Sequence, residues 1–241
     1  MALIEKAKGR RENQSPSGYT RLFGIPALGQ LMSRVQGTVI SSGTELEKLI
    51  WERVNQVQDL DKFIADVTAR AGEDKVYVAS KWQVKKSKSI NSTYEPDFLA
   101  FNPKKLECYI VEVKDGDTFD TKKAAGEHTT LKNFTNDIAQ GLPFSTKVYL
   151  CAFNAATKQE IYTGLKAKFS MDEILTGQEL CALFNIDYGE IVKIRTNDQQ
   201  SNLDYFVKEI IKIDSIRAMI VKRLQQFKRN HNENKPSDLG L

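Results

Sequence analysis

The sequence predicts an α/β fold with a central mixed β-sheet flanked by helices, plus a largely helical C-terminal region. Three observations support this prediction. A helical pattern over residues 44–70 precedes two strand-like runs joined by a turn. A second helical pattern and a buried strand follow, and helical periodicity dominates from residue 170 onward. With 241 residues, 41% of them hydrophobic, the chain can build one sizeable domain or a domain with a subdomain.

The first third of the chain predicts two helices and a strand. Residues 28–39 favour a short helix after a polar N-terminal segment. Over residues 44–70, apolar side chains recur at helical spacing, with Ser42 or Thr44 as the N-terminal cap and a break near residues 58–59. Residues 75–79, Lys-Val-Tyr-Val-Ala, are typical of a strand.

Both helices and strands are expected in the remainder. Thr121 or Asp120 is expected to cap a helix that runs to residue 140. Strands are expected at residues 147–153, 160–163 and 190–195, and helices at residues 171–184 and 204–229. The last helix carries an isoleucine-rich stripe, which indicates core or a dimer interface.

The most informative stretch is a predicted hairpin over residues 95–114. Residues 97–101 and 107–113 are aromatic and β-branched, and Asn-Pro-Lys-Lys at 102–105 has a turn composition. A hairpin centred there pairs positions whose numbers sum to 209, so Asp97 lies opposite Glu112. Alternation along the strand puts Lys114 on the same face as Glu112 and turns Val113 the other way.

Two carboxylates and an ammonium in one patch indicate a metal-assisted hydrolase. Asp97 and Glu112 would repel each other without a cation between them. Oxygen ligands with no clustered His or Cys favour Mg²⁺ over Zn²⁺, and the backbone carbonyl of Val113 is a further candidate ligand. Lys114 would lie beside the attacking water. Glu47 shares a helix face with Ile50, so we expect its carboxylate to point inward.

Glu95-Pro96-Asp97 followed by Glu112-Val113-Lys114 resembles the PD-(D/E)xK nuclease superfamily, and most closely its type II restriction endonucleases. The resemblance implies a restriction-endonuclease-like core and Mg²⁺-dependent, sequence-specific cleavage of double-stranded DNA by an activated water. Because many members carry a helix acid at the metal site, it also suggests that role for Glu47. We expect an arm at residues 1–40, the nuclease core at 41–165, a mostly helical part at 166–230 and a disordered tail at 231–241.

The same resemblance implies partners and a location. Cleavage of both strands of a palindromic site favours a homodimer, because the symmetries of protein and DNA then match. A restriction enzyme also requires a protective DNA methyltransferase in its host. A prokaryotic cytoplasm is the expected location, since the sequence shows no signal peptide and no apolar span of membrane length. The three cysteines are widely spaced, which disfavours a disulfide framework.

Lysines near the predicted hairpin are candidate DNA contacts. The net charge is only +4, so basic character must be local. One acid-free run contains Lys81, Lys85, Lys86 and Lys88, and the start of the next helix contains Lys122 and Lys123. These lysines are expected to bind phosphates. Glu127 and Asp137 are expected to be surface acids.

Three alternatives remain. The same core serves repair or junction nucleases, which assays on nicked and branched substrates would separate from a restriction enzyme. A DNA-binding module with a decayed site is the second, although the intact triad of Asp97, Glu112 and Lys114 argues against decay. The third is a structural or interaction protein whose motif match is accidental, and it would show no metal-dependent DNA binding.

Overall fold

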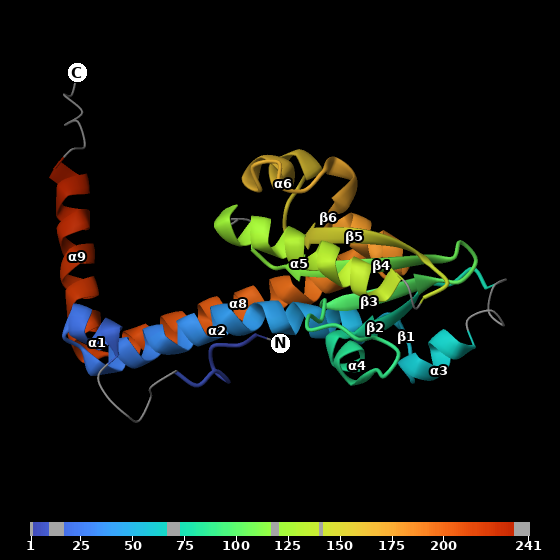
Figure 1. The fold of residues 1–241 in the computed structure, drawn as a ribbon. Helices are drawn as coiled ribbons and strands as arrows, with labels where there is room; N and C mark the ends of the chain where they lie inside the picture. Colours follow the sequence, from blue (N-terminus) through green and yellow to red (C-terminus); the bar gives the residue numbers. More distant parts are fainter. Residues whose placement is uncertain (1, 10–16, 67–72, 117–120, 140–141, 234–241) are drawn as a thin grey trace, which may run out of the picture. The chain divides into compact units, whose positions relative to one another are not determined.

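The computed structural model describes residues 2–9, 17–66, 73–116, 121–139 and 142–233 (Figure 1). The chain forms two compact units. Residues 1–42 and 194–241 make up a helical unit, and residues 43–193 make up a sheet unit that contains every described strand. The helices are α1 (Gly18–Phe23), α2 (Pro26–Trp51), α3 (Leu60–Ala65), α4 (Lys81–Lys86), α5 (Thr121–Ala139), α6 (Lys158–Gly164), α7 (Gly177–Phe184), α8 (Tyr188–Lys212) and α9 (Asp214–Glu233).

The sheet unit is built on a mixed six-stranded sheet, with strands in the order β1-β2-β3-β4-β5-β6. The strands are β1 (Asn55–Gln56), β2 (Tyr77–Ser80), β3 (Phe98–Asn102), β4 (Glu107–Lys114), β5 (Ser145–Ala152) and β6 (Ile174–Thr176). The β2–β3 and β3–β4 pairs are antiparallel, whereas β1–β2, β4–β5 and β5–β6 are parallel. This arrangement confirms the predicted α/β fold with a central mixed sheet.

Both faces of the sheet are buried. On one face, Leu99 and Ile110 belong to a core cluster that also contains Leu131 and Phe134 of α5. On the other face, the ring of Phe98 packs edge-on against Phe184 of α7, with centroids 5.8 Å apart. Because side chains alternate along β4, Glu112 shares the α5 face with Ile110. The charged end of β4 therefore lies at the margin of the main core.

The boundaries predicted for the helices at residues 28–39 and 44–70 are wrong. One continuous helix, α2, spans Pro26–Trp51, and the separate helix α3 covers only Leu60–Ala65. α2 continues through the intervening Ser-Ser-Gly, where the hydroxyls of Ser41 and Ser42 donate to carbonyls one turn back, at 3.0 and 2.8 Å, instead of capping a new helix. Residues 67–70 of the predicted helix lie outside the described residues.

Two predicted strands are helical. Residues 160–163 lie in α6, which Thr157 caps by accepting a hydrogen bond from the Glu160 amide. Residues 190–195 lie in α8, whose first turn is capped by Asp187. In both segments a short β-branched run resembled a strand, but only one side chain, Ile161 or Ile191, is fully buried. A single buried position suits one face of a helix better than a strand buried on both faces.

The helix predicted at 171–184 is confirmed only in its second half, as α7, because its first half forms a 3₁₀ turn (Met171–Glu173) and then strand β6. The predicted helix at 204–229 is divided between α8 and α9, since the chain turns at Ile213. The tail expected from residue 231 remains helical to Glu233, and the rest lies outside the described residues.

Hydrogen bonds join the first residues to α8 in the helical unit. The Ile4 amide donates to the Asn202 side chain, which donates in turn to the Ala2 carbonyl, both at 2.8 Å. Arg34 of α2 donates to the Tyr205 hydroxyl at 2.8 Å. All three cysteines of the chain are buried free thiols. Among the described helices, none has the length and apolar character needed to cross a membrane.

Candidate active site

The predicted hairpin register is confirmed. Phe98 pairs with Val111 and Asn102 with Glu107, so paired positions sum to 209. Asp97 directly precedes β3, and the same register places it opposite Glu112. The turn residue Leu106 adopts a left-handed backbone with φ of 51°. Strand pairing and alternation therefore gather Asp97, Glu112 and Lys114 at the end of the β3–β4 pair farther from the turn.

Asp97 is held by backbone groups on two sides. Its Oδ2 accepts a hydrogen bond from the Val113 amide at 2.8 Å, and its own carbonyl accepts one from the Lys81 amide at 3.1 Å. Asp97 is only 6% exposed and Glu112 only 8%. Burial, and then the charge of Glu112, raise the pKa of Asp97 above its usual range. A positive charge close to these two buried carboxylates would therefore stabilise their ionised forms.

Lys114 supplies part of that charge. Its Nζ lies 2.8 Å from Oε1 of Glu112 and 2.9 Å from Oε1 of Glu127 on α5. Burial alone would lower the pKa of Lys114, but Glu112 and Glu127 outweigh it and raise that pKa, so the side chain is an ammonium. Glu127, expected to be a surface acid, is partly exposed and also pairs with Lys114, whereas Asp137 is exposed as expected.

The second oxygen of Glu112 has a partner that sequence reasoning missed. The Tyr94 hydroxyl donates to Oε2 of Glu112 at 2.6 Å. Burial and the Glu112 charge raise the pKa of Tyr94, so its phenol stays protonated and acts as the donor. The only sequence signal is that Tyr94 stands three residues before Asp97. The oxygens of Glu112 are therefore divided between Tyr94 and Lys114.

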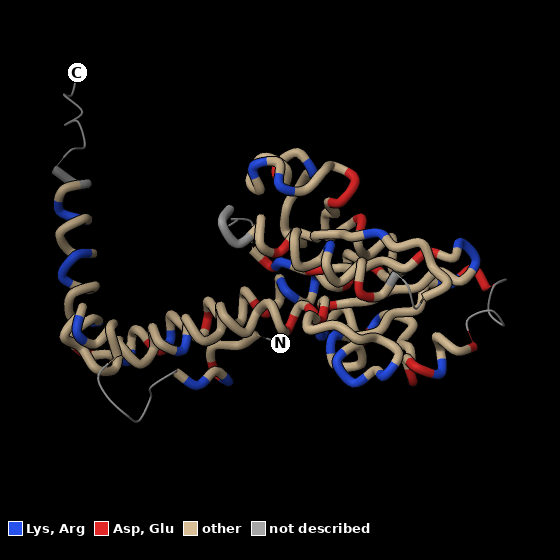
Figure 2. Tube along the Cα trace, viewed as in Figure 1, with Lys and Arg blue, Asp and Glu red and all other residues tan. Residues whose placement is uncertain are grey.

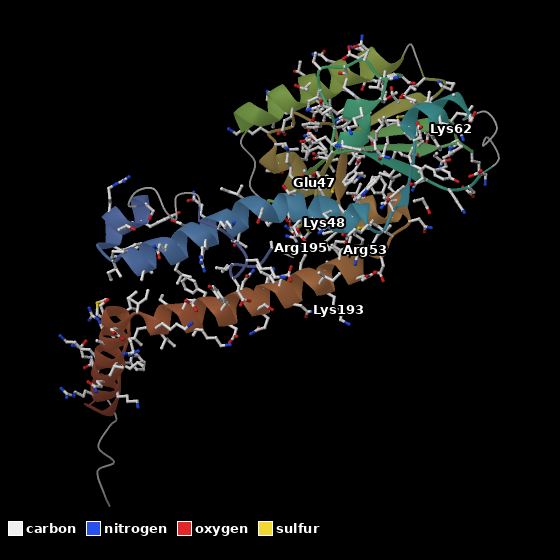
Figure 3. All side chains as sticks on the ribbon, turned by 90° about the horizontal axis from the view of Figure 1, so that it is seen from below. Glu47, Lys48, Arg53, Lys62, Lys193 and Arg195 are labelled. Atoms are coloured by element: carbon white, nitrogen blue, oxygen red, sulfur yellow. The ribbon has the colours of Figure 1, made fainter. Side chains whose placement is uncertain are left out.

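Glu47 is a residue of α2 (Figure 3). It is half-buried, and burial raises the pKa of its carboxyl. Lys81, Glu112 and Lys114 also act on that pKa, which places Glu47 within their electrostatic range. Across the part of the chain that the structure describes, no three Asp, Glu, His or Cys side chains are close enough to form a ready-made metal cage.

Exposed lysines lie on α4 and just after it, and Figure 2 shows their positions along the chain in blue. Lys81 is about half exposed, and its Nζ lies 3.9 Å from Oδ1 of Asp97. Lys86 lies over the ring of the exposed Trp82, 3.7 Å from its centroid. Lys85 and Lys88 are exposed too. Lys122 and Lys123 stand in the first turn of α5, but their side chains lie outside the described part of the structure.

Comparison with known proteins identifies the family. No family model and no solved structure matches the chain. The chain is 43% identical over 227 residues to the type II restriction enzyme HhaII of Haemophilus parahaemolyticus, a match that covers 92% of this chain and 99% of that enzyme. The chain therefore belongs to the type II restriction enzymes. It is a site-specific deoxyribonuclease.

Proposed function

We propose that this enzyme cleaves double-stranded DNA by PD-(D/E)xK chemistry and uses Mg²⁺. The observation that carries the proposal is the convergence of Asp97, Glu112 and Lys114 at the end of the β3–β4 pair. The metal would neutralise charge on the scissile phosphate and lower the pKa of the attacking water. Sequence specificity would come from DNA contacts elsewhere on the protein.

The donor set fits Mg²⁺. Asp97 and Glu112 offer hard carboxylate oxygens, and Glu47 is a third candidate. Mg²⁺ commonly takes one or two protein carboxylates and fills its other positions with water and substrate phosphate.

The Val113 carbonyl is a further candidate ligand. Continuing the β3–β4 register places Pro96 opposite Val113. In an antiparallel pair, the N–H and C=O of one residue point to the same neighbouring strand. The Val113 amide donates to Asp97, so the Val113 carbonyl faces that side as well. Pro96 has no N–H to donate to this carbonyl, and the oxygen is thus suited to a cation.

The residues of the chain then have distinct roles. Asp97 and Glu112 hold the cation, and the Val113 amide fixes Asp97 in place. Lys114 orients the attacking water as a point charge and stabilises the charge that develops on the phosphate. The exposed lysines Lys81, Lys85, Lys86 and Lys88, with Lys122 and Lys123, are proposed phosphate contacts.

Digestion of plasmid DNA with Mg²⁺ or with EDTA tests this assignment. Asp97→Ala and Lys114→Ala should each abolish cleavage while a gel-shift assay shows that DNA binding persists. Lys147→Ala is the matched control, since Lys147 pairs with Glu107 near the start of the β4–β5 pair. Circular dichroism verifies that each variant is folded. Full activity in either site variant would refute the proposed mechanism.

We also propose a homodimer that joins through the helical unit, within a host that carries a protective DNA methyltransferase. The helical unit holds most of the exposed large apolar side chains among the described residues. On α8, Leu203, Val207 and Ile211 recur every four residues, and α9 exposes Ile220 and Leu224. Exposed apolar stripes of this kind mark interaction surfaces.

Sedimentation tests the dimer. The double variant Ile220→Glu and Leu224→Glu should sediment as a monomer at concentrations where the wild type is a dimer. Lys222→Glu, a charge change on the same helix, should sediment like the wild type. A wild-type chain that remains monomeric with its DNA bound would rule out the homodimer.

A further inference from the structure

The placement of Tyr94 relative to Glu112 suggests a specific task for this tyrosine. The two oxygens of Glu112 have different partners, Oε1 with the Lys114 ammonium at 2.8 Å and Oε2 with the Tyr94 hydroxyl at 2.6 Å. The terminal torsion of a glutamate is soft, so an unheld carboxylate rotates over a broad range. A short hydrogen bond to one oxygen restricts that rotation and leaves the other oxygen aimed at Lys114.

Tyr94 is held by contacts with α5. Its ring packs edge-on against Phe134, with centroids 6.2 Å apart, at the margin of the main core cluster. Two residues earlier, the Ser92 hydroxyl donates to Oδ2 of Asp137 at 2.7 Å and also accepts from the Tyr94 amide at 3.3 Å. The segment before Asp97 is thus attached to α5 at two points, so the hydroxyl of Tyr94 has a defined position.

We propose that Tyr94 is a positioning residue for Glu112, and that its hydroxyl fixes the plane of the carboxylate that holds the metal. This inference rests on the proposed function, because it assigns Glu112 to the metal. Tyr94 touches neither the metal nor the DNA in this role. It acts through Glu112 alone, as the hydrogen-bond partners of metal ligands commonly do. Loss of such a partner typically costs about 10- to 100-fold in metal affinity or activity.

Tyr94→Phe tests the inference by removing one hydroxyl and keeping the ring against Phe134. The half-saturating Mg²⁺ concentration for plasmid cleavage should rise at least about 10-fold. Binding of Mn²⁺ as a probe, followed by electron paramagnetic resonance without DNA, should weaken by a similar factor. A gel shift in EDTA should show unchanged affinity for DNA, because the tyrosine has no role in DNA binding.

Tyr109→Phe is the matched control. The Tyr109 hydroxyl donates to Oε2 of Glu107 at the same distance, 2.6 Å, on the same strand but at the end near the turn. This variant loses an equivalent hydrogen bond and should keep the Mg²⁺ and Mn²⁺ dependence of the wild type. Equal weakening of metal binding in both variants would mean a general structural effect and would overturn the inference.

The two proposals fail in distinguishable ways. If Lys114→Ala or Asp97→Ala retains full activity, the proposed mechanism is refuted whatever the result for Tyr94→Phe. If both are inactive and Tyr94→Phe has wild-type Mg²⁺ dependence and wild-type Mn²⁺ binding, the mechanism stands and the role of Tyr94 is refuted.

Discussion

Lys114 bridges two carboxylates from different elements: its Nζ lies 2.8 Å from Glu112 on β4 and 2.9 Å from Glu127 on α5. A cation that binds Glu112 would compete with Lys114 for the same carboxylate. Glu127 would then be the remaining anion that keeps the ammonium in place. The pairing with Glu127 thus lets Lys114 stay in the site while Glu112 changes its partner.

Glu127→Gln should therefore slow DNA cleavage about 10-fold, equivalent to about 1.4 kcal/mol in the activation free energy. The amide keeps a polar oxygen but loses the charge that holds Lys114. Single-turnover cleavage at saturating Mg²⁺ gives the rate. Glu107→Gln, which breaks the Lys147 pair on the same sheet, should leave the rate unchanged. A wild-type rate for Glu127→Gln would show that Glu112 alone holds the lysine.

Glu47→Gln separates a functional role from a structural one. Burial raises the pKa of Glu47, so the charged form is costly in the folded protein. The neutral amide of Glu47→Gln should leave the melting temperature of the protein equal or higher. If Glu47 acts at the metal, the same variant should cleave DNA at least about 10-fold more slowly. Glu52→Gln, an exposed change just after α2, serves as the control. Unchanged cleavage would exclude Glu47 from the proposed metal site.

The lysines around α4 should contribute to the salt dependence of DNA binding. If Lys85 and Lys86 each contact a phosphate, the double alanine variant should reduce the slope of log affinity against log salt by about 1.8. Fluorescence anisotropy in EDTA over a range of KCl concentrations gives this slope. Alanine at Lys104 and Lys105, in the β3–β4 turn, is the control. Equal slopes for the wild type and the Lys85 and Lys86 double variant would show that these lysines do not contact DNA phosphates.

Ionisation of Glu173 should make the stability of the folded protein depend on pH in the acid range. Burial opposes its ionisation, but Lys132, the Ser170 amide and His128 outweigh burial and lower the pKa of Glu173 to about 2. Because the folded pKa is depressed, the stabilisation is complete above the unfolded value of 4.5 and is lost as the pH falls toward 2.

Glu173→Gln should accordingly lower the free energy of unfolding at pH 7 by about 1–2 kcal/mol, after allowance for solvent screening. The difference from wild type should shrink as the pH falls from about 5 toward 2. Urea unfolding at several pH values measures it, with the neighbouring exposed Asp172→Asn as control. A deficit that stays constant down to pH 2 would contradict the assignment to Glu173 ionisation.

The local part of the site was predictable from sequence. A turn of four residues and the period of two along a strand fix the hairpin register. The grouping of Asp97, Glu112 and Lys114 at one end of the hairpin therefore follows from short-range rules alone. The prediction of a strand at 160–163 was wrong. Its run of Ile, Tyr and Thr has strand propensity, but the cap at Thr157 and burial on one side only favour a helix.

The contacts across elements could not be predicted. Glu127 meets Lys114 only because α5 packs over the sheet and presents that turn of the helix to the end of β4. Tyr94 meets Glu112 because the segment before β3 is attached to α5. Neither contact has a fixed sequence spacing, since both depend on how a helix packs on a sheet.

The hydrogen bond from the Val113 amide to the Asp97 side chain bears on how an inactive form of the enzyme is best made for crystallisation with uncut DNA. Alanine at position 97 would leave a buried amide without an acceptor, at a cost of about 1–3 kcal/mol. Asparagine keeps an oxygen for that amide and discards the negative charge. If Asp97 holds the metal as proposed, Asp97→Asn is therefore the more suitable starting point for trapping the intact substrate in a properly folded protein.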